Sequence, residues 1–425
     1  VISQAESGHG CPISMTYSAV PALRAEPEIA DEWVPRILSS QYDRRMQPAG
    51  EKHGALFGMA MTERQGGSDV RANEMRAVPL AGSDSEYLLS GQKWFCSAPM
   101  CDAFLMLAQT DGGLTCFLVP RFRPDGTRNA FHIQRLKDKL GNRSNASSEI
   151  ELNEAWGQRV GELGRGVRTI IEMVRHTRLD CVIGSTSLMR QAVSQATHHA
   201  HYRYAFGKAL DQQPLMQNVL ADLCVESEAA TIAMMRLARS YDSDTSEQEQ
   251  HFRRLATAVL KYWICKRGPA VTYESLECLG GNGYVEESGM PRTFRESPLN
   301  SIWEGSGNVI CLDVLRAVAR EPESLQAFFA ELAESEGSDS RYDAALENLR
   351  DEFVNPDGLE TRSRRIVEQM GLLLQASLLM HSSPAAVSDA FIASRLAGDW
   401  GIAFGTLPAS TDFMAIIDRN RPELN

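Results

Sequence analysis

The sequence lacks the features that mark membrane-spanning, secreted and metal-binding proteins. It contains no apolar run long enough to span a bilayer and no signal-peptide pattern. Its nine cysteines form no Cys-x-x-Cys pair, and such an odd, scattered set favours reduced thiols and a cytoplasmic protein. His198, His199 and His201 come closest to a metal-binding cluster, but they stand in a helical pattern without an acidic or cysteine partner. We therefore expect neither a metal nor contact with a membrane.

Lysine is missing from the last quarter of the chain. Residues 317–425 contain nine Arg, no Lys and eighteen Asp or Glu, a local balance of −9 within a net charge of −12. An acidic surface repels nucleic-acid phosphates, so DNA binding is unfavourable for this segment. Arg362, Arg364 and Arg365 form a small cluster, but acidic residues flank it on both sides.

The sequence also lacks a Gly-x-Gly-x-x-Gly turn between a strand and a helix, so a dinucleotide cofactor would be bound without a Rossmann fold. What is present is an ordinary globular composition. The chain has 425 residues, of which 43% are hydrophobic and 23% are charged. This length suffices for about two to four domains with a large core.

Residues 1–56 are predicted to form a truncated, helical N-terminal domain. The chain enters, almost at once, a pattern typical of the middle of a domain, so we expect a further N-terminal part to precede it. A short helix is expected over residues 13–20, stopped by Pro21. Pro27 and Pro35 then punctuate a passage that we expect to be rich in loops.

Residues 57–156 change in character and are predicted to form a β domain. Strand-like runs at residues 87–95, 104–108 and 115–120 are separated by glycine-bearing turns. Because these strands follow one another without helices between them, we expect a mainly antiparallel barrel or sandwich.

The rest of the chain is predicted to be helical. In residues 157–320, Leu188, Ala192 and Ala196 recur at a spacing of four, and long helices joined by short loops indicate an antiparallel bundle. Residues 321–425 have their own acidic composition and are predicted to form an additional helical domain. The sequence as a whole therefore predicts a mainly α protein with a central β domain.

The stretch Asn300–Asn308 presents one carboxylate among small and polar residues. Glu304 follows Trp303 and precedes Gly305 and Gly307, which let the backbone take a positive φ or approach a ligand closely. An apolar run at helical spacing comes next, so we expect Glu304 on a turn before a helix N-terminus, where an anion is favoured. Taken alone, the stretch is also typical of a solvated loop carboxylate.

Four further motifs offer contacts to a ligand. A Gly-Gly loop over residues 59–69 frees backbone amides that can bind the carbonyls of a flat heteroaromatic ring or a phosphate, although surface turns share this pattern. Trp94 ends a strand and can stack on a planar cofactor or belong to a core. Arg203 can pair with a diphosphate, and the glycine loop at residues 280–284 has room for a phosphate or a ribose.

Together these motifs resemble the acyl-CoA dehydrogenase family over residues 54–320. The shared landmarks, in order, are Met61-Thr62-Glu63, Gly67-Ser68-Asp69, Lys93-Trp94, Asp138-Lys139-Leu140-Gly141, Arg143-Ser144, Arg203, Phe206-Gly207, Gly280-Gly281-Asn282-Gly283-Tyr284 and Trp303-Glu304-Gly305-Ser306. Residues 11–16, 61–70, 137–147 and 300–308 are most similar to a branch of the family that serves the adaptive response to DNA alkylation and carries an extra C-terminal helical domain. The resemblance implies a helical N-terminal part, an antiparallel β barrel or sandwich, a C-terminal four-helix bundle and that additional domain.

The resemblance also implies FAD, lying between the β domain and the C-terminal helices, and a homotetramer whose subunits share each cofactor. The flavin and its chain would contact Met61, Thr62, Gly67, Ser68, Trp94, Phe95 and Ser97. The diphosphate and adenosine of the FAD in a neighbouring subunit would be held by Arg203, Phe206, Gln213, Gln217, Gly280, Gly281 and Gly283. Ser306 and Asn308 would add cofactor contacts beside Glu304.

The implied reaction is the α,β-dehydrogenation of an acyl-CoA thioester. Glu304 would take the α proton while a hydride passes from the β carbon to flavin N5, and Thr177, at the family's alternative base position, cannot serve. Trp303 and Arg178 would line the substrate pocket. Trp303 stands where the family usually has Tyr, which narrows the pocket and favours a short or branched acyl thioester. The sequence does not identify the electron acceptor.

Two other functions are open at the level of the sequence. One is a DNA-binding flavoprotein that protects against alkylation damage and has a weak or vestigial dehydrogenase activity. The acidic balance of residues 317–425 argues against it. The other is oxidation of a nitroalkane, but the branch of the family with that activity uses Asp as its base, whereas this chain has Glu304.

Overall fold

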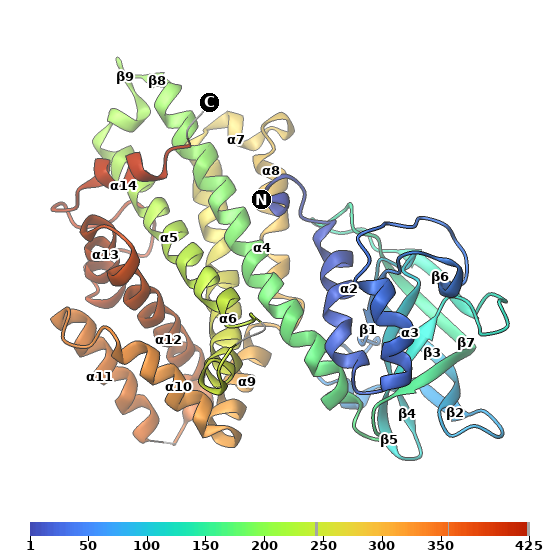
Figure 1. Cartoon of the computed structure of the whole chain (residues 1–425). Helices are drawn as coiled ribbons and strands as arrows, with labels where there is room; N and C mark the ends of the chain where they lie inside the picture. The colour runs from blue at the N-terminus through green and yellow to red at the C-terminus, as the bar shows by residue number, and fades with distance from the viewer. Residues whose placement is uncertain (243–244, 356, 423–425) are drawn as a thin grey trace. The chain divides into compact units, whose positions relative to one another are not determined.

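The computed structural model describes residues 1–242, 245–355 and 357–422. The chain divides into two compact units, residues 2–180 and residues 181–425, with Val1 counted in the second. The first unit contains the main sheet, and the second consists of helices with one short hairpin (Figure 1). The predicted fold class, mainly α with a central β region, is therefore confirmed. The four-domain division with boundaries after residues 56, 156 and 320 stays a prediction.

Three helices open the first unit: α1 Ile2–Ala5, α2 Gly10–Leu23 and α3 Pro27–Ile37. The expectation that Pro21 stops a helix is wrong, because Pro21 lies inside α2. The expected loop-rich passage begins later, since Pro27 begins α3 and residues 38–56 follow with only a short 3-10 helix. Pro27 occupies the first turn, where a missing N–H loses no intrahelical partner. Pro21 forfeits one backbone bond, but α2 buries Met15, Ala19 and Leu23, and this apolar burial offsets the loss.

The strands of the first unit form one sheet that closes on itself. They are β1 Phe57–Ala60, β2 Arg76–Pro79, β3 Glu86–Ser97, β4 Ala103–Thr110, β5 Gly113–Pro120, β6 Phe131–Leu136 and β7 Ser147–Val160. Antiparallel pairing runs from β4 to β5, β7, β3 and β2, and a parallel pair between Arg76 and Gln109 returns to β4. β1 lies parallel to β4, and β6 lies antiparallel to β7. The result is a small barrel with mainly antiparallel strands.

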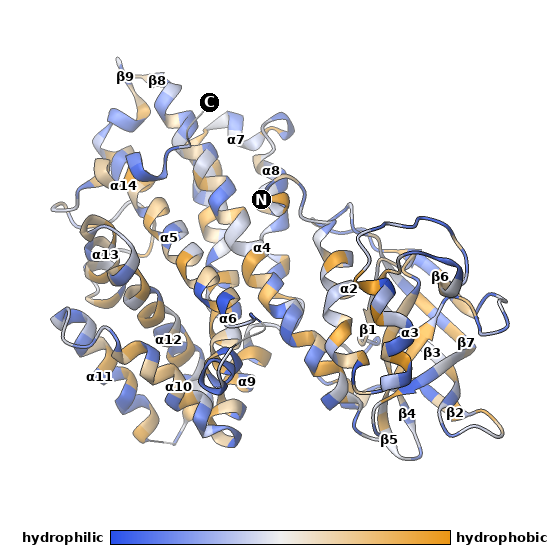
Figure 2. Cartoon of the chain, viewed as in Figure 1, coloured by the Kyte–Doolittle hydropathy of each residue, from blue (hydrophilic) through white to orange (hydrophobic). Residues whose placement is uncertain are grey.

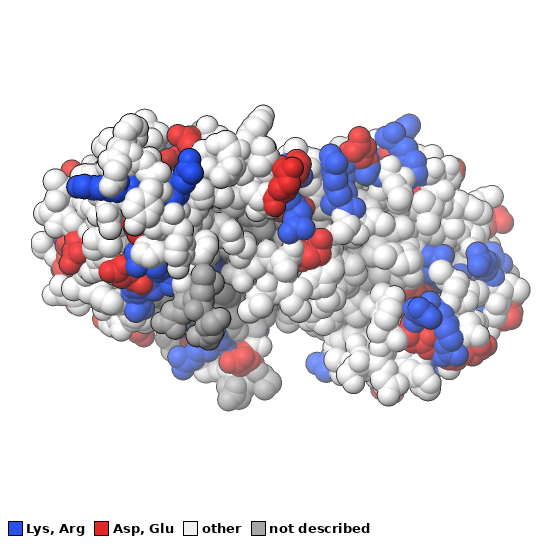
Figure 3. Space-filling model, turned by 90° about the horizontal axis from the view of Figure 1, so that it is seen from above, with Lys and Arg blue, Asp and Glu red and all other residues white. Residues whose placement is uncertain are grey.

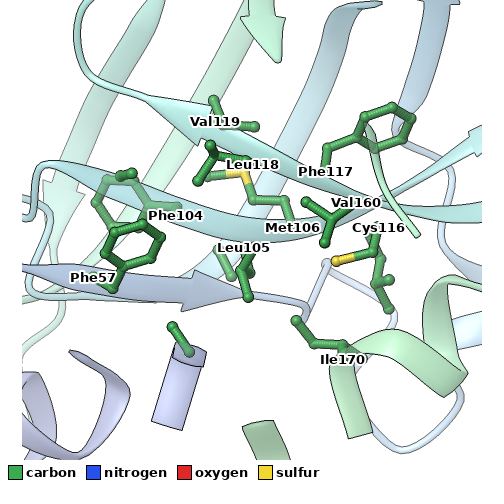
Figure 4. Packing of buried hydrophobic residues seen from close by; sticks show 14 of the residues in the cluster. Phe57, Phe104, Leu105, Met106, Cys116, Phe117, Leu118, Val119, Val160 and Ile170 are labelled. Atoms are coloured by element: carbon green, nitrogen blue, oxygen red, sulfur yellow. The ribbon is translucent and has the colours of Figure 1, made fainter. Parts of the chain in front are cut away.

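Strand β4 of the barrel wall is buried along most of its length, since every residue from Ala103 to Ala108 is buried. A continuous apolar run of this kind is what a strand covered on both faces requires. Phe104 stacks on Phe131 with ring centroids 4.9 Å apart, and Trp33 of α3 meets Phe57 edge-on at 5.1 Å. Figure 4 labels Phe57 and Phe104 among the buried residues of this core. The core fixes β1 and β3, which carry the first half of the candidate site.

The second unit is organised around long helices. The first is α4 Gly166–Tyr202, which starts in the first unit. A hairpin of β8 Tyr204–Ala205 and β9 Lys208–Ala209 follows it. The remaining α-helices up to residue 320 are α5 Pro214–Arg239, α6 Glu247–Cys278, α7 Gly281–Tyr284, α8 Met290–Glu296 and α9 Gly307–Arg320. α6 packs against α5 and α9. The thiol of Cys265 on α6 donates to the Cys181 carbonyl of α4 at 3.4 Å. α6 thus contacts α4, α5 and α9 within the second unit.

Residues beyond α9 form α10 Pro322–Ala333, α11 Ser340–Val354, α12 Leu359–Ser382, α13 Ala385–Phe391, a π-helical turn at Ile392–Leu396 and α14 Phe413–Asn420. α12 packs on α5, α6 and α9, α10 on α6, and α14 on α5. Apolar residues fall in stripes on these helices, as Figure 2 shows, and amphipathic helices bury such stripes against one another. No helix among the described residues combines the length and the apolar character needed to cross a membrane.

A buried ionic cluster joins the C-terminal segment to the bundle. Arg395 is 1% exposed at its side chain and bonds to Asp222 and, at 3.0 Å, to Glu226, both on α5. Arg267 of α6 also bonds to Glu226, through two contacts of 3.0 Å. Burial alone would raise the pKa of Glu226, but the two guanidinium groups lower it from 4.5 to about 2. The cluster therefore holds an ionised carboxylate in the interior.

Candidate active site

The Gly-Gly loop of the first unit is fastened to the barrel by the buried Glu63. Its carboxylate accepts from the backbone N–H of Glu74 at 2.6 Å and of Met75 at 3.3 Å. Lys93 of β3, whose side chain is fully buried, donates to Glu63 Oε1 at 2.7 Å and to the Leu107 carbonyl at 2.8 Å. Burial lowers the pKa of Lys93, and the Glu63 carboxylate opposes that shift. The pair thus fixes the loop after β1 against β3 and β4.

This fastening brings two groups of predicted cofactor residues together. The backbone N–H of Trp94 donates to the Thr62 carbonyl at 2.8 Å, so Met61 and Thr62 lie directly beside the end of β3. A Cβ at Gly67 would stand 2.5 Å from Thr62 Oγ1, so only glycine lets the loop fold back on Thr62. Ser68 follows on the exposed part of the loop.

Trp94 is half-buried and carries two cations on its ring. Lys137 Nζ lies 3.5 Å from the ring centroid, and the guanidinium carbon of Arg64 lies 5.1 Å from it. Lys137 also lies 4.7 Å from the ring centroid of the exposed Phe95 and bonds to Glu149 at 2.6 Å. Cations attracted to the π face fix the indole in place and make its surroundings electropositive. Such surroundings suit a ligand with negative charge or with carbonyl groups.

A buried acceptor beside Ser97 lacks a donor. Asn145 donates from Nδ2 to Ser97 Oγ at 3.4 Å, but its buried Oδ1 has no hydrogen-bond partner among the described residues. An unsatisfied buried acceptor costs free energy unless a ligand or water supplies a donor. Together with the Gly67 turn, this orphaned oxygen fits a cofactor that presents N–H or O–H groups at this edge, as a flavin does. Asn145 was not among the residues that the sequence motifs singled out as contacts.

In the second unit, several residues that are predicted to bind the diphosphate of FAD lie around an exposed hairpin. Arg203 follows α4 directly and is exposed. Phe206 is 97% exposed with φ +53°, and Gly207 follows with φ +80°, as the two-residue turn of a hairpin requires. Gln213 Nε2 donates to the Ala205 carbonyl at 3.1 Å. Gln213 therefore secures the hairpin, and its amide nitrogen is already engaged within the chain.

Gln217 is engaged as well, since its Nε2 donates to the Asp211 carbonyl at 3.0 Å. The glycine turn predicted after α6 is present, with Gly280 at φ +58° and Gly281 starting α7. A Cβ at Gly283 would lie 2.0 Å from the Leu276 carbonyl oxygen, so this position admits only glycine. The β8–β9 hairpin and α7 lie at the same end of the unit (Figure 1).

Glu304 lies on the predicted turn before a helix. Its φ is +57°, a left-handed conformation that is uncommon for any residue other than glycine, and Gly305 follows with φ +103°. Ser306 is the N-cap of α9, and Asn308 is exposed in its first turn. The first N–H groups of a helix have no intrahelical acceptors, so they and the helix dipole favour negative charge in this position.

Four hydrogen bonds support the turn around Glu304. The indole N–H of Trp303 donates to Asn300 Oδ1 at 3.0 Å, and Asn300 Nδ2 donates to Ser185 Oγ of α4 at 3.2 Å. From α6, the buried ammonium of Lys261 donates to the Trp303 carbonyl at 2.9 Å and to the Gly305 carbonyl. The carbonyls on both sides of Glu304 therefore accept from one cation.

Two further predicted residues lie on α4 in the first unit. Thr177 is buried and its hydroxyl donates to the Val174 carbonyl at 3.1 Å, and Arg178 is buried next to it. The role of Arg178 in a substrate pocket stays a prediction, as do the roles assigned to all the other residues of the candidate site. Among the described residues, no group of three His, Cys, Asp or Glu side chains is arranged to hold a metal ion.

The sequence motifs missed the residues that support the site, although two of them left a signal. Lys93 stands at an inward position of a strand, and Lys261 is the one charged residue in the otherwise apolar run from Thr257 to Cys265. A lone lysine in a buried stretch needs hydrogen-bond acceptors for its ammonium, so the pattern indicates a specific polar contact in the folded protein. Asn145 left no such signal, because nothing local shows which loop asparagine loses its partner.

Family models match almost the whole of residues 1–319. The C-terminal domain of acyl-CoA dehydrogenase matches residues 164–319, its middle domain matches residues 58–155, and the N-terminal domain of the adaptive response protein AidB matches residues 1–44.

Individual relatives give the same result. The AidB protein of Escherichia coli (strain K12) is 47% identical over 384 residues, which are 90% of this chain and 70% of the relative. Acyl-CoA dehydrogenase family member 11 of Caenorhabditis elegans is 32% identical over 80% of this chain, but only 57% of that relative is covered. Among solved structures, Caenorhabditis elegans ACDH-11 in complex with C11-CoA superimposes with a TM-score of 0.81 at 29% identity, covering 92% of this chain and 72% of that one.

Proposed function

Since this chain belongs to the acyl-CoA dehydrogenase family, whose members are FAD-dependent oxidoreductases, we propose that it dehydrogenates an acyl-CoA thioester between the α and β carbons. The observation that carries the proposal is the turn of Glu304. One carboxylate is held in a left-handed backbone conformation, before the N-terminus of α9, by contacts on both of its flanks. An unfavourable backbone conformation that the surrounding structure holds in place is typical of a catalytic residue.

Glu304 would act as the base. It removes a proton from the α carbon, whose C–H bond breaks as the α,β double bond forms. FAD, when bound, supplies the acceptor for the hydride that leaves the β carbon. The α proton of a thioester becomes acidic enough only if the carbonyl oxygen is polarised, so backbone N–H groups near the turn would donate to that oxygen while Trp303 helps to exclude water.

The first unit would supply most of the flavin contacts. Met61, Thr62, Gly67 and Ser68 would border the flavin and its chain from the loop, and Trp94, Phe95 and Ser97 from the end of β3. The fit of this surface rests on the orphaned Asn145 oxygen, the Gly67 turn and the electropositive surroundings of Trp94. Because Lys93 and Glu63 fix these two segments against each other, the surface is pre-organised for a flat ring.

The proposed substrate is a short or branched acyl-CoA. Trp303 supports this choice, because its indole is larger than the ring of the usual Tyr and its N–H is tied to Asn300 at 3.0 Å. To admit a longer chain, the ring would have to break this bond, at a cost of about 1 kcal/mol. We propose that Arg178, buried on α4, borders the same substrate.

The test is anaerobic reduction of the bound flavin by a panel of acyl-CoAs, followed by absorbance. In Glu304→Gln, flavin reduction should be lost for every acyl-CoA that reduces the wild type, with flavin content unchanged, because Gln keeps the size of the side chain but accepts no proton. Glu287→Gln, at an exposed carboxylate on the loop after α7, is the matched control and should behave as the wild type. A Glu304→Gln protein that is reduced at the wild-type rate would disprove the assignment of the base.

We further propose that the cofactor is shared between subunits of a homotetramer. Arg203, Phe206 and the turn of Gly280, Gly281 and Gly283 would reach the diphosphate and adenosine of a neighbouring subunit's FAD. The nearly complete exposure of Phe206 at the hairpin tip supports this role, since an aromatic ring in that position gains from burial by a partner. Arg203→Ala should lower flavin content in parallel with the tetramer fraction measured by light scattering, and a stable monomer with full flavin content would contradict the sharing.

Duplex DNA is the alternative ligand, favoured by the match of residues 1–44 to the AidB N-terminal domain. The charge distribution opposes it. Arg362 bonds to Glu352 and to the Asn355 carbonyl, and Arg365 lies 4.0 Å from the same glutamate. On the face drawn in Figure 3, Lys and Arg side chains stand among Asp and Glu side chains. Titration of labelled duplex at about 0.15 M salt decides between the two, because micromolar binding lost on mutating the arginines would favour DNA.

A further inference from the structure

We propose that Lys261 is the positioning residue that sets the direction of the Glu304 side chain. The inference rests on the proposed function, in which Glu304 is the base. Lys261 is on α6, far from the turn in sequence, and it is 1% exposed. Its ammonium donates to the carbonyl of Trp303 at 2.9 Å and to the carbonyl of Gly305, the residues immediately before and after Glu304.

These two carbonyls decide how Glu304 is presented. The Trp303 carbonyl belongs to the peptide plane that enters Glu304, and fixing its oxygen also fixes the direction of the Glu304 N–H. The Gly305 carbonyl belongs to the peptide plane between Gly305 and Ser306. Fixing both planes limits the φ and ψ angles of Glu304 and Gly305, which lie between them. With both oxygens directed at one ammonium, fewer directions are open to the Cα–Cβ bond of Glu304.

The conformation needs such support. Glu304 has φ +57°, which places its Cβ close to its own backbone and is unfavourable for a residue with a side chain. Residues held in this region persist only where the surroundings over-determine them. Without Lys261, the peptide planes that carry the Trp303 and Gly305 carbonyls would lose a restraint, and the backbone between them could relax toward more common angles and move the carboxylate.

Two other contacts near the turn act on side chains rather than on these carbonyls. Asn300 fixes the indole ring of Trp303 rather than its carbonyl. Ile310 limits Gly305 from the side, since a Cβ there would lie 3.0 Å from the Ile310 side chain, but it makes no hydrogen bond to the peptide plane. Lys261 is thus the side chain that acts on the backbone oxygens flanking Glu304.

A lysine is suited to this position for a physical reason. A buried ammonium is strongly unfavourable unless acceptors surround it, so its own location is narrowly determined by the carbonyls that it binds. A neutral donor would bind the same oxygens more weakly, because hydrogen bonds to a charged donor are about twice as strong as neutral ones. The cation and the turn therefore hold each other in one arrangement.

The experiment compares Lys261→Met and Lys261→Gln with the wild type, using the full chain with its flavin. Met removes the donors at similar length, whereas Gln keeps neutral donors. Arg395→Met is the control, because it disturbs the interior of the same unit without touching the turn. Glu304→Gln is measured in parallel. The readouts are flavin content, the rate of flavin reduction per bound flavin by butyryl-, isobutyryl- and isovaleryl-CoA, the acyl-CoA concentration for half-maximal rate, and hydrogen–deuterium exchange over residues 299–310 without acyl-CoA.

Lys261→Met should keep its flavin and the concentration of acyl-CoA for half-maximal rate, while the reduction rate falls by about tenfold to a hundredfold, the loss expected from displacing a reacting group by about 1 Å. Exchange should accelerate selectively over residues 299–310 in this variant, whereas in Arg395→Met any acceleration should be spread over the whole second unit. Lys261→Gln should lie between Met and the wild type, and it replaces Met in every comparison if the Met variant does not fold.

Unchanged rate and unchanged exchange in Lys261→Met would overturn the proposal, and so would an equal loss of rate in Arg395→Met. The failure of the proposed function has a different signature. If Glu304→Gln reduces its flavin at the full rate, or if no acyl-CoA reduces the wild type, then Glu304 is not the base, whatever the exchange over the turn shows.

Discussion

Removing Arg395 should destabilise the second unit strongly. This guanidinium is buried and bonds to two carboxylates of α5, Asp222 and Glu226. In Arg395→Met, Glu226 keeps Arg267, whose two bonds of 3.0 Å are untouched. Asp222 keeps only neutral donors, the Trp400 indole N–H at 3.3 Å and the Gly405 N–H at 2.9 Å. The variant therefore leaves one buried carboxylate without the cation that bonds to it in the native protein.

The expected cost follows from the loss of that bonded cation, which the more distant Arg267 compensates only through its field. Breaking a buried ion pair by removing one partner costs about 3–5 kcal/mol, and the surviving neutral donors place Asp222 at the lower part of that range. For a unit of this size the loss corresponds to a fall in Tm of roughly 10 °C. Because Trp400 and Gly405 are tied to the same carboxylate, residues 395–405 should also become sensitive to protease before the rest of the unit unfolds.

Thermal unfolding followed by far-UV circular dichroism measures the effect. Arg350→Met is the matched control, since Arg350 bonds to Glu336 at 2.9 Å on the surface and its loss should leave the midpoint almost unchanged. The double variant Arg395→Met with Asp222→Asn should recover most of the loss, because both charges are then gone. A single variant as stable as the control, or a double variant no better than the single one, would refute the reasoning.

Two further predictions concern ionisable groups. The pKa of Glu226 is about 2 in the folded protein and 4.5 in its ordinary state, so the carboxylate contributes about 3 kcal/mol above pH 4.5 that is lost as the pH falls toward 2. Acid unfolding of Glu226→Gln, followed by circular dichroism, should show a shallower dependence on pH in that window, and an identical slope would contradict the assignment. Lys93→Met should leave Glu63 unpaired, lower Tm and reduce the flavin content of the purified protein, with partial recovery in the double variant that adds Glu63→Gln. Full flavin content at an unchanged Tm would mean that the pair does not hold the loop.

The turn of Glu304 could be predicted from the sequence because the signals that mark it are local. Gly305 and Gly307 allow the turn, and the apolar spacing after them predicts α9. The supports of the turn could not be predicted in this way. Lys261 reaches Trp303 across 42 residues, and Lys93 reaches Glu63 across 30. Such contacts depend on how helices and strands pack, which one sequence does not reveal.

The error at Pro21 has a related cause. The local rule, that proline ends a helix, is correct for an isolated segment. In the folded unit, α2 buries Met15, Ala19 and Leu23 against the barrel core, and this long-range burial extends the helix past the proline. The predicted antiparallel barrel succeeded because strand runs and glycine turns are also local signals, and each of them is repeated several times along the chain.

The edge of β4 shows how the barrel accommodates the loop of residues 61–75. β1 and β2 both run parallel to β4 on the same edge, with Ala60 opposite Met106 and Arg76 opposite Gln109. The two short strands are therefore one interrupted strand, and residues 61–75 are an excursion whose ends lie about 10 Å apart along β4. In the gap, the Leu107 carbonyl accepts from Lys93 in place of a strand partner. The barrel wall is therefore closed on both sides of the loop, and Glu63 ties the excursion to β3, so residues of the loop away from Glu63 can be substituted without opening the wall.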